Sequence, residues 1–145
     1  MKILVINGPN INMLGIREPK IYGNGTYEDL CRFIESAFEE YKVTGEIFQS
    51  NHEGDIVGRI QQAYGDVDGI VINAAAYTHT SIATMDALLA VGIPSVEVHI
   101  SDTDTREEFR KKSFVSLAAE RMIKGKGFEG YREAIAYLAS KGEDR

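Results

Sequence analysis

Residues 67–73, VDGIVIN, decide the fold because they contain an almost continuous apolar run without alternation of apolar and polar side chains. Such a run is typical of a strand that is buried on both faces, as in the middle of a parallel sheet. Another apolar run of strand length lies before it, at residues 3–6, and a strand-length segment in which apolar and polar residues alternate lies after it, at residues 95–100. We therefore predict a parallel sheet that is covered by helices on both faces.

Helical patterns separate the predicted strands. Apolar residues recur every three or four positions at residues 30–41, 56–64, 82–90 and 131–138. Two further strands are expected at residues 46–50 and 122–123. Strands that alternate with helices indicate an α/β protein, and five strands favour a flavodoxin-like three-layer sandwich with a parallel sheet of order 2-1-3-4-5.

Three capping-box patterns mark expected helix starts, at residues 26–29, 50–53 and 105–108. The third is expected to open a short helix that runs through Phe109. At the other end of the first helix, Thr44 and Gly45 are expected to terminate it.

The bulk composition fits one domain spanning residues 1–145. A net charge of −6 argues against non-specific binding to nucleic acid or to an acidic membrane, which requires a basic surface. No apolar stretch approaches the ~20 residues of a transmembrane helix, and the N-terminus lacks a signal-peptide pattern. The single Cys31 fits a reducing compartment, so we expect a cytoplasmic protein in which Cys31 is a buried thiol.

The segment after the first strand, residues 7–23, is longer than the ~2–6 residues usual for such a connection. Long loops of this kind are commonly functional. Arg17 and Tyr22 are its candidate side chains for strong electrostatics and proton transfer, and Gly15 and Gly23 flank them as hinges of a predicted lid. The alternative is a solvated loop in which Arg17 and Tyr22 occur by chance.

Polar side chains gather where the first four predicted strands end. Ligands of such folds bind beyond the carboxyl ends of the strands, so we expect a site there. A set rich in amides, hydroxyls, imidazoles and guanidinium groups suits a small, anionic, hydroxylated ligand. The residues are Asn7, Asn10 and Asn12; Ser50, Asn51, His52 and Glu53; Asn73, Tyr77, Thr78, His79 and Ser81; and His99, Ser101 and Asp102, followed by Arg106 and Arg110.

Among these, Glu97 and His99 stand out because they share one face of the predicted strand, on which Glu97 can orient the imidazole. Tyr22 and His99 are therefore the candidate acid–base groups. For His52 the alternative is a role at the start of a helix, and for His79 a hydrogen bond within its loop.

Several classes of site are disfavoured. The histidines lack metal-site spacing and there is no second cysteine, so no metal is expected. The first loop begins Gly-Pro-Asn rather than with the Gly-x-Gly-x-x-Gly turn of a dinucleotide site, and Asn stands where a phosphorylated receiver domain needs acidic residues.

Four blocks of sequence resemble the type II 3-dehydroquinate dehydratases in order and spacing, and together they span nearly the whole chain. They are residues 7–23, 48–54, 73–81 and 96–110. The resemblance implies a flavodoxin-like subunit and a homododecamer built as four trimers. It implies a lyase that reversibly dehydrates 3-dehydroquinate to 3-dehydroshikimate in the shikimate pathway, by trans elimination through an enolate and without a cofactor.

The resemblance also implies roles for individual residues. Tyr22 would be the proton acceptor, Arg17 the cation that activates it and His99 the proton donor. Asn10 would position a water or the enolate, and Glu97 would support His99. The implied substrate contacts are Asn73, His79 and Arg110 to hydroxyls, the Ile100 and Ser101 backbone to the carboxylate, and Asp86 from the adjacent subunit.

The chain departs from the usual family pattern at a few positions. Met85 and Ala74 stand where Arg and Pro are common, and Lys111, Lys112 and Phe114 replace His, His and Tyr. These changes concern contacts around the site and between subunits rather than the reaction. Two rivals remain from the residues alone: a non-catalytic flavodoxin-like module that binds a polyhydroxy carboxylic acid, and an electron carrier that binds phosphate or flavin. Both biosynthesis and quinate breakdown fit the sequence.

Overall fold

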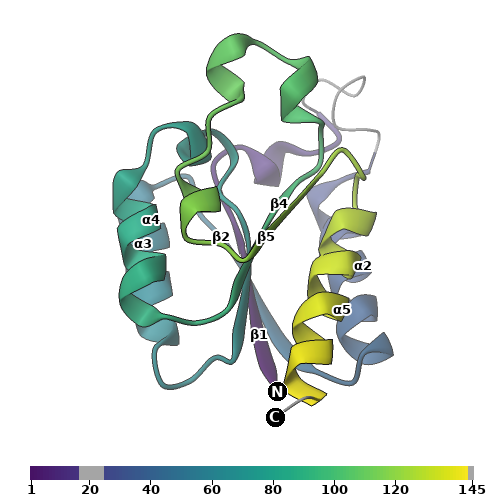
Figure 1. Cartoon of the computed structure of the whole chain (residues 1–145). Coiled ribbons are helices and arrows are strands. Elements are labelled where there is room, and N and C mark those ends of the chain that lie inside the picture. The colour runs from purple at the N-terminus through teal and green to yellow at the C-terminus, as the bar shows by residue number, and fades with distance from the viewer. Residues whose placement is uncertain (17–24, 144–145) are drawn as a thin grey trace.

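The computed structural model describes residues 1–16 and 25–143 (Figure 1). Five parallel strands form one sheet in the order β2-β1-β3-β4-β5, which confirms the predicted order. The strands are β1 (Lys2–Asn7), β2 (Thr44–Gln49), β3 (Gly69–Asn73), β4 (Ser95–His99) and β5 (Arg121–Lys124).

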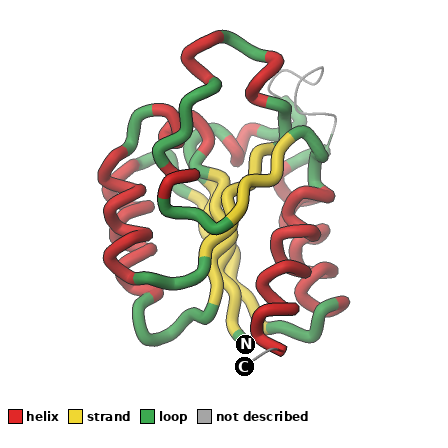
Figure 2. The backbone as a smooth tube through the Cα atoms, in the orientation of Figure 1, coloured by secondary structure: helices red, strands yellow, loops and turns green. Residues whose placement is uncertain are grey.

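Helices cover both faces of the sheet, as the flavodoxin-like sandwich requires (Figures 1 and 2). The helices α2 (Tyr27–Glu40) and α5 (Glu129–Glu143) lie on one face, and α3 (Glu53–Ala63) and α4 (Ile82–Val91) lie on the other. Along β3, Val71 belongs to the core under α2 and α5, whereas Ile70 and Ile72 belong to the core under α3 and α4. The strand carries apolar side chains at successive positions from Ile70 to Ile72 because it is buried on both faces.

The helix α2 begins with the predicted capping box. The Asp29 N–H donates to Thr26 Oγ1 at 3.1 Å, and the Thr26 N–H donates to Asp29 Oδ2 at 3.0 Å. This exchange satisfies two N–H groups that a helix leaves without partners inside it.

The other two capping-box predictions are wrong. The helix α3 begins after His52, and the Ser50 hydroxyl accepts the His52 N–H at 3.0 Å and donates to Asp55 instead of capping. In residues 105–108 the backbone of Arg106 is extended, so two short 3-10 turns, Thr103–Thr105 and Glu108–Arg110, replace the expected helix.

The expected end of the first helix is also misplaced. The helix ends at Glu40, the chain turns at Lys42 with φ 55°, and Thr44 and Gly45 belong to β2. A side chain at Gly45 would collide with the ring of Phe38, which explains a glycine inside this strand.

Two further expectations concern membrane spans and the single cysteine. In residues 1–16 and 25–143 no helix is long and apolar enough to cross a membrane. Cys31, predicted to be a buried thiol, is half-buried on α2.

Candidate active site

A cavity of about 190 Å³ opens at the carboxyl end of the sheet, where the sequence predicts a site. Its walls come from the segments that follow β1, β3 and β4. Eight predicted site residues line it: Asn10, Asn73, His79, His99, Ile100, Ser101, Arg106 and Arg110.

Other predicted residues lie elsewhere. Asp86 is exposed on α4 and is not among the residues lining the cavity of its own chain. His52 is exposed at the start of α3, so only His79 and His99 of the three histidines line the cavity. Arg17 and Tyr22, the predicted cation and base, lie outside the described residues, as does most of the predicted lid.

The segment after β1 is fixed at two points. The Gly8 N–H donates to the Asn73 carbonyl oxygen at 2.8 Å, and a Cβ at Gly8 would collide with the Ala74 backbone. We call this close backbone contact between Gly8 and Ala74 the Gly8–Ala74 seam. Two residues on, Asn10 adopts the left-handed conformation with φ 70°, which asparagine tolerates, and its N–H donates to Asn51 Oδ1 at 3.0 Å.

The side chain of Asn73 is held on both sides. Its Oδ1 accepts the Ala75 N–H at 3.1 Å, and its Nδ2 donates to the Tyr131 hydroxyl at 2.9 Å. The Tyr131 hydroxyl donates in turn to Asn7 Oδ1 at 2.7 Å. Burial raises the pKa of Tyr131, so the hydroxyl keeps the hydrogen that this bond requires.

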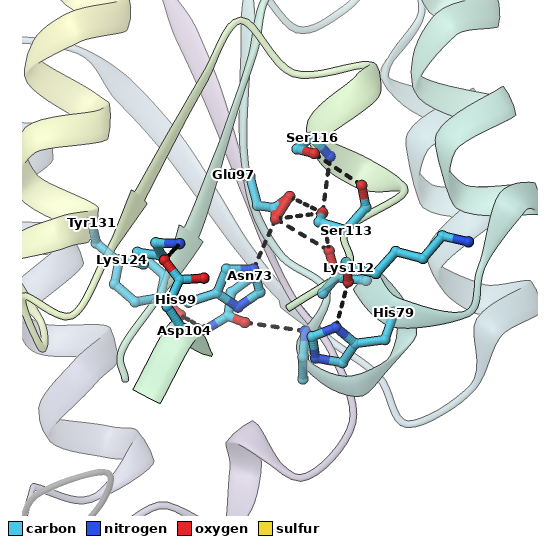
Figure 3. Close-up of polar contacts among 12 residues, drawn as sticks. Asn73, His79, Glu97, His99, Asp104, Lys112, Ser113, Ser116, Lys124 and Tyr131 are labelled. Atoms are coloured by element: carbon cyan, nitrogen blue, oxygen red, sulfur yellow. Dashed lines mark hydrogen bonds and ion pairs between the residues drawn. The ribbon is translucent and has the colours of Figure 1, made fainter. Parts of the chain in front are cut away.

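His79 contacts the main chain of a distant segment. Its Nδ1 lies 2.6 Å from the Lys112 carbonyl oxygen (Figure 3). Because a carbonyl oxygen only accepts, Nδ1 carries the hydrogen of this bond, and Nε2 is the ring nitrogen left for a ligand. The ring therefore suits the hydroxyl group of a ligand in the cavity.

Glu97 and His99 form a buried pair (Figure 3), and His99 is the member of the pair that lines the cavity. The His99 Nε2 lies 2.8 Å from Glu97 Oε2, which confirms that the two side chains share one face of β4. Glu97 is inaccessible to solvent and also receives hydrogen bonds from Ser113 and Thr78. A buried carboxylate needs such donors, and its bond to Nε2 leaves Nδ1 as the ring nitrogen for a bound molecule.

Two guanidinium groups complete the cavity wall. Arg110 and Arg106 both line it, and Arg110 Nε donates to Glu107 Oε2 at 2.8 Å. A hydrogen bond from its own backbone and the nearby arginines hold the pKa of Glu107 below its usual range. Guanidinium groups carry several N–H donors and suit the oxygen atoms of a ligand.

Two contributors to this site were not predicted as such. Tyr131 looked like one more core residue in the apolar stripe of α5, and its long reach to Asn73 left no signal in the sequence. Ser113 lies in a segment without periodicity, 16 residues from Glu97.

The arrangement defines a class of protein. It is a flavodoxin-like α/β protein whose cavity combines an imidazole, held by a buried carboxylate, with amides and guanidinium groups for a small anionic ligand. Among the described residues, no three His, Cys, Asp or Glu side chains are grouped so that they could hold a metal ion.

Comparison with known proteins identifies the family. The model of the family "Dehydroquinase class II" matches residues 1–139, and the chain belongs to this family. It is 57% identical to the 3-dehydroquinate dehydratase of Clostridium acetobutylicum over 138 residues, which are 95% of this chain and 96% of that protein. It is 51% identical to the catabolic 3-dehydroquinase of Aspergillus clavatus, over 99% of this chain and 95% of that one.

The solved structures agree. The type II dehydroquinase of Butyrivibrio crossotus superposes with a TM-score of 0.93 at 51% identity, covering 95% of this chain and 97% of that one. Membership of this family confirms the resemblance predicted from the sequence and does not favour the rival reading of a non-catalytic binding module.

Proposed function

We propose that this family member is a hydro-lyase that reversibly dehydrates 3-dehydroquinate to 3-dehydroshikimate, a step of the shikimate pathway. The observation that carries the proposal is the buried Glu97–His99 pair at the wall of the cavity, in a chain that belongs to the dehydroquinase class II family. Elimination of water needs a base, an acid and donors for an enolate, and each has a candidate among the residues predicted from the sequence.

The first step removes a proton from the carbon next to the ketone. Tyr22 is the proposed base, and its role rests on the resemblance. A phenol is mostly protonated at neutral pH, and a neighbouring guanidinium favours the phenolate, which is the proposed contribution of Arg17. The enolate that forms is stabilised by hydrogen-bond donors, with Asn10 placing a water or the enolate itself.

The second step expels a hydroxyl group, which is a poor leaving group until it is protonated. His99 is the proposed acid. Its Nε2 is bonded to Glu97 Oε2 at 2.8 Å, so Nδ1 of the imidazolium delivers the proton. The C–O bond breaks, the enolate electrons form the new C=C bond, and water leaves.

The remaining lining residues are proposed to hold the substrate. Amide, imidazole and guanidinium groups of Asn73, His79 and Arg110 suit its hydroxyls, and the backbone of Ile100 and Ser101 suits its carboxylate. The residues used here supply acid–base and hydrogen-bonding chemistry, so the proposed reaction proceeds without a cofactor. A cytoplasmic location is proposed from the composition and the single cysteine.

We also propose the homododecamer of four trimers, in which Asp86 completes the site of a neighbouring subunit. Asp86 lies on α4 between Ile82 and Leu89, whose exposed fractions are 52% and 57%. Their spacing of four and three residues places the three side chains on one face of the helix. Large apolar side chains exposed together with a carboxylate support a contact with a second copy of the chain.

The test of this function is ultraviolet absorbance on mixing the purified protein with 3-dehydroquinate, because the product is a conjugated enone. We expect absorbance to rise with the wild type and with the control Tyr64→Phe. We expect no comparable rise with Tyr22→Phe or His99→Asn, although both should fold. A folded wild type that gives no rise would overturn the proposed function.

A further inference from the structure

We propose that Ser113 is a positioning residue for the reaction: it fixes the carboxylate of Glu97 and, through it, the imidazole of His99. The inference rests on the proposed role of His99 as proton donor. Ser113 itself is not among the residues that line the cavity, so it acts through its neighbours (Figure 3).

The hydroxyl of Ser113 is directed at Glu97 by its other contacts. Ser113 Oγ lies 2.5 Å from Glu97 Oε1 and 2.8 Å from Oε2. The Ser116 N–H donates to the same Oγ at 3.0 Å, which occupies an acceptor position of the hydroxyl. Thr78 Oγ1 also lies 2.8 Å from this Oγ, and either hydroxyl could donate in that contact. The ionised carboxylate of Glu97 can only accept, so the Ser113 hydroxyl is the donor in its contact with Glu97.

Ser113 fixes the plane of the carboxylate. Glu97 Oε2 is bonded to His99 Nε2, and Thr78 Oγ1 lies 3.2 Å from the same oxygen. Ser113 adds a contact of 2.5 Å to the other oxygen, Oε1. A carboxylate held through both oxygens cannot rotate about its last C–C bond without losing a hydrogen bond, so Oε2 stays aimed at the imidazole.

The segment that carries Ser113 is itself anchored to the site. The Lys112 carbonyl oxygen accepts from His79 at 2.6 Å, and the Phe114 N–H donates to the Thr78 carbonyl oxygen at 2.8 Å. Residues 112–114 therefore contact His79 directly and His99 through Glu97. We infer that this segment sets the positions of the two imidazoles relative to each other.

The consequence for catalysis concerns the tautomer of His99. The bond to Glu97 keeps a hydrogen on Nε2, so that the transferable proton is the one on Nδ1. When Glu97 is free to rotate, Nε2 loses a fixed acceptor and the ring loses its orientation. The loss falls on the proton-transfer step and leaves substrate binding mostly intact.

The first test is Ser113→Ala, with Ser116→Ala as the matched control. Ser116 lies in the same segment, but its hydroxyl donates to the Ser113 carbonyl oxygen at 2.9 Å. We expect Ser113→Ala to lower kcat about tenfold, which is only part of the rate enhancement that a positioned general acid contributes. KM should change less than about twofold. Ser116→Ala should retain wild-type kcat. Equal kcat values for Ser113→Ala and the wild type would overturn the inference.

A double-mutant cycle separates positioning from a general structural effect. If Ser113 acts through Glu97, then Ser113→Ala should lower kcat less than about twofold in a Glu97→Gln background, because interacting residues are not additive. An undiminished tenfold loss in that background contradicts the proposal. If Ser113→Ala does not fold, the near-isosteric Ser113→Cys, with its weak donor, takes its place with the same expectations.

The proposed role of His99 is tested separately. A His99→Asn variant that keeps its turnover overturns that role and this inference with it, whereas an inactive His99→Asn beside a fully active Ser113→Ala overturns the inference alone. The protein has three histidines, so its NMR spectrum after labelling with ¹³C-histidine contains three imidazole signals. In ligand-free protein, Ser113→Ala should shift the NMR signal of His99, and Ser116→Ala should not. An unshifted signal in Ser113→Ala contradicts the positioning role without reference to turnover.

Discussion

The side-chain amide of Asn73 donates from Nδ2 to the hydroxyl of Tyr131 at 2.9 Å, so a helix on the face of the sheet fixes an amide at the wall of the cavity. The same hydroxyl donates to Asn7 Oδ1 at 2.7 Å, and Tyr131 is fully buried. One phenol thus links the ends of β1 and β3.

Removing this hydroxyl should affect both stability and substrate binding. In Tyr131→Phe, Asn7 and Asn73 each lose a buried hydrogen-bond partner. We therefore expect the free energy of unfolding, measured in urea, to fall by about 2 kcal/mol. KM should rise more than kcat falls, because Asn73 is a proposed binding residue. The matched control is Tyr137→Phe on the same helix, whose hydroxyl bonds to Glu120 at the surface. Equal stability of the two variants would contradict the assignment.

Replacement of Lys112 should leave activity unchanged. The contact with His79 is made by the Lys112 carbonyl oxygen, so Lys112→Ala preserves it. The Lys112 side chain lies over the Phe114 ring instead, at 4.3 Å from its centroid. We expect wild-type kcat and KM for Lys112→Ala, whereas His79→Ala should raise KM about tenfold by removing a substrate hydrogen bond. Matching losses of activity in both variants would show that the lysine side chain is needed.

Hybrid oligomers test the proposed role of Asp86. Asp86→Asn and His99→Asn should each be inactive, since each removes one part of every site. When the two variants are unfolded together, mixed and refolded, some sites combine an intact Asp86 from one subunit with an intact His99 from another. We expect turnover to reappear in the mixture and sedimentation to match the wild-type assembly. If the mixture stays inactive while it assembles normally, Asp86 does not act across subunits.

The capping box of α2 should make the free energy of unfolding depend on pH. The Thr26 backbone N–H, together with Arg32, holds the pKa of Asp29 below its usual range. A carboxyl whose pKa is lower in the folded protein stabilises above its unfolded pKa of about 3.9 and loses that contribution as the pH falls through the folded value. The stability difference between wild type and Asp29→Asn in urea should therefore be present at pH 7 and shrink below about pH 4. A difference that does not change with pH would exclude this origin.

The thiol of Cys31 should react slowly with alkylating reagents. Burial raises the pKa of the half-buried Cys31, so less of the reactive thiolate is present at neutral pH. We expect modification by iodoacetamide to be much slower in the folded protein than in urea, as followed by mass spectrometry. Equal rates in both conditions would contradict the shielding of this thiol.

The sequence predicted those features that depend on local pattern and on the geometry of parallel strands. The apolar run that ends at Asn73 predicted a central strand. Because ligands bind at the carboxyl ends of parallel strands, the sequence also predicted one site for Asn10, Asn73, His79 and His99, which line one cavity. The spacing of Glu97 and His99 predicted their shared face correctly because side chains alternate along a strand.

The remaining features depend on contacts that leave no local pattern. Tyr131 lies 58 residues from Asn73 in the chain, and a tyrosine that reaches a polar partner has the same periodicity as one that only packs. His52 lies near the carboxyl end of a strand, as His79 and His99 do, yet it is exposed. The capping box predicted at residues 50–53 does not form because α3 begins only at Glu53, with His52 at the N-cap position, and the Ser50 hydroxyl accepts the His52 N–H instead.

The Gly8–Ala74 seam determines how this enzyme could be redesigned for other acids. The backbones after β1 and β3 already touch there, so no side chain can be added and no space can be gained between them. Room for a bulkier substrate has to come from the side chains of other lining residues, such as Thr103 or Ile11. A library built to broaden the substrate range should therefore vary those positions and keep Gly8 unchanged.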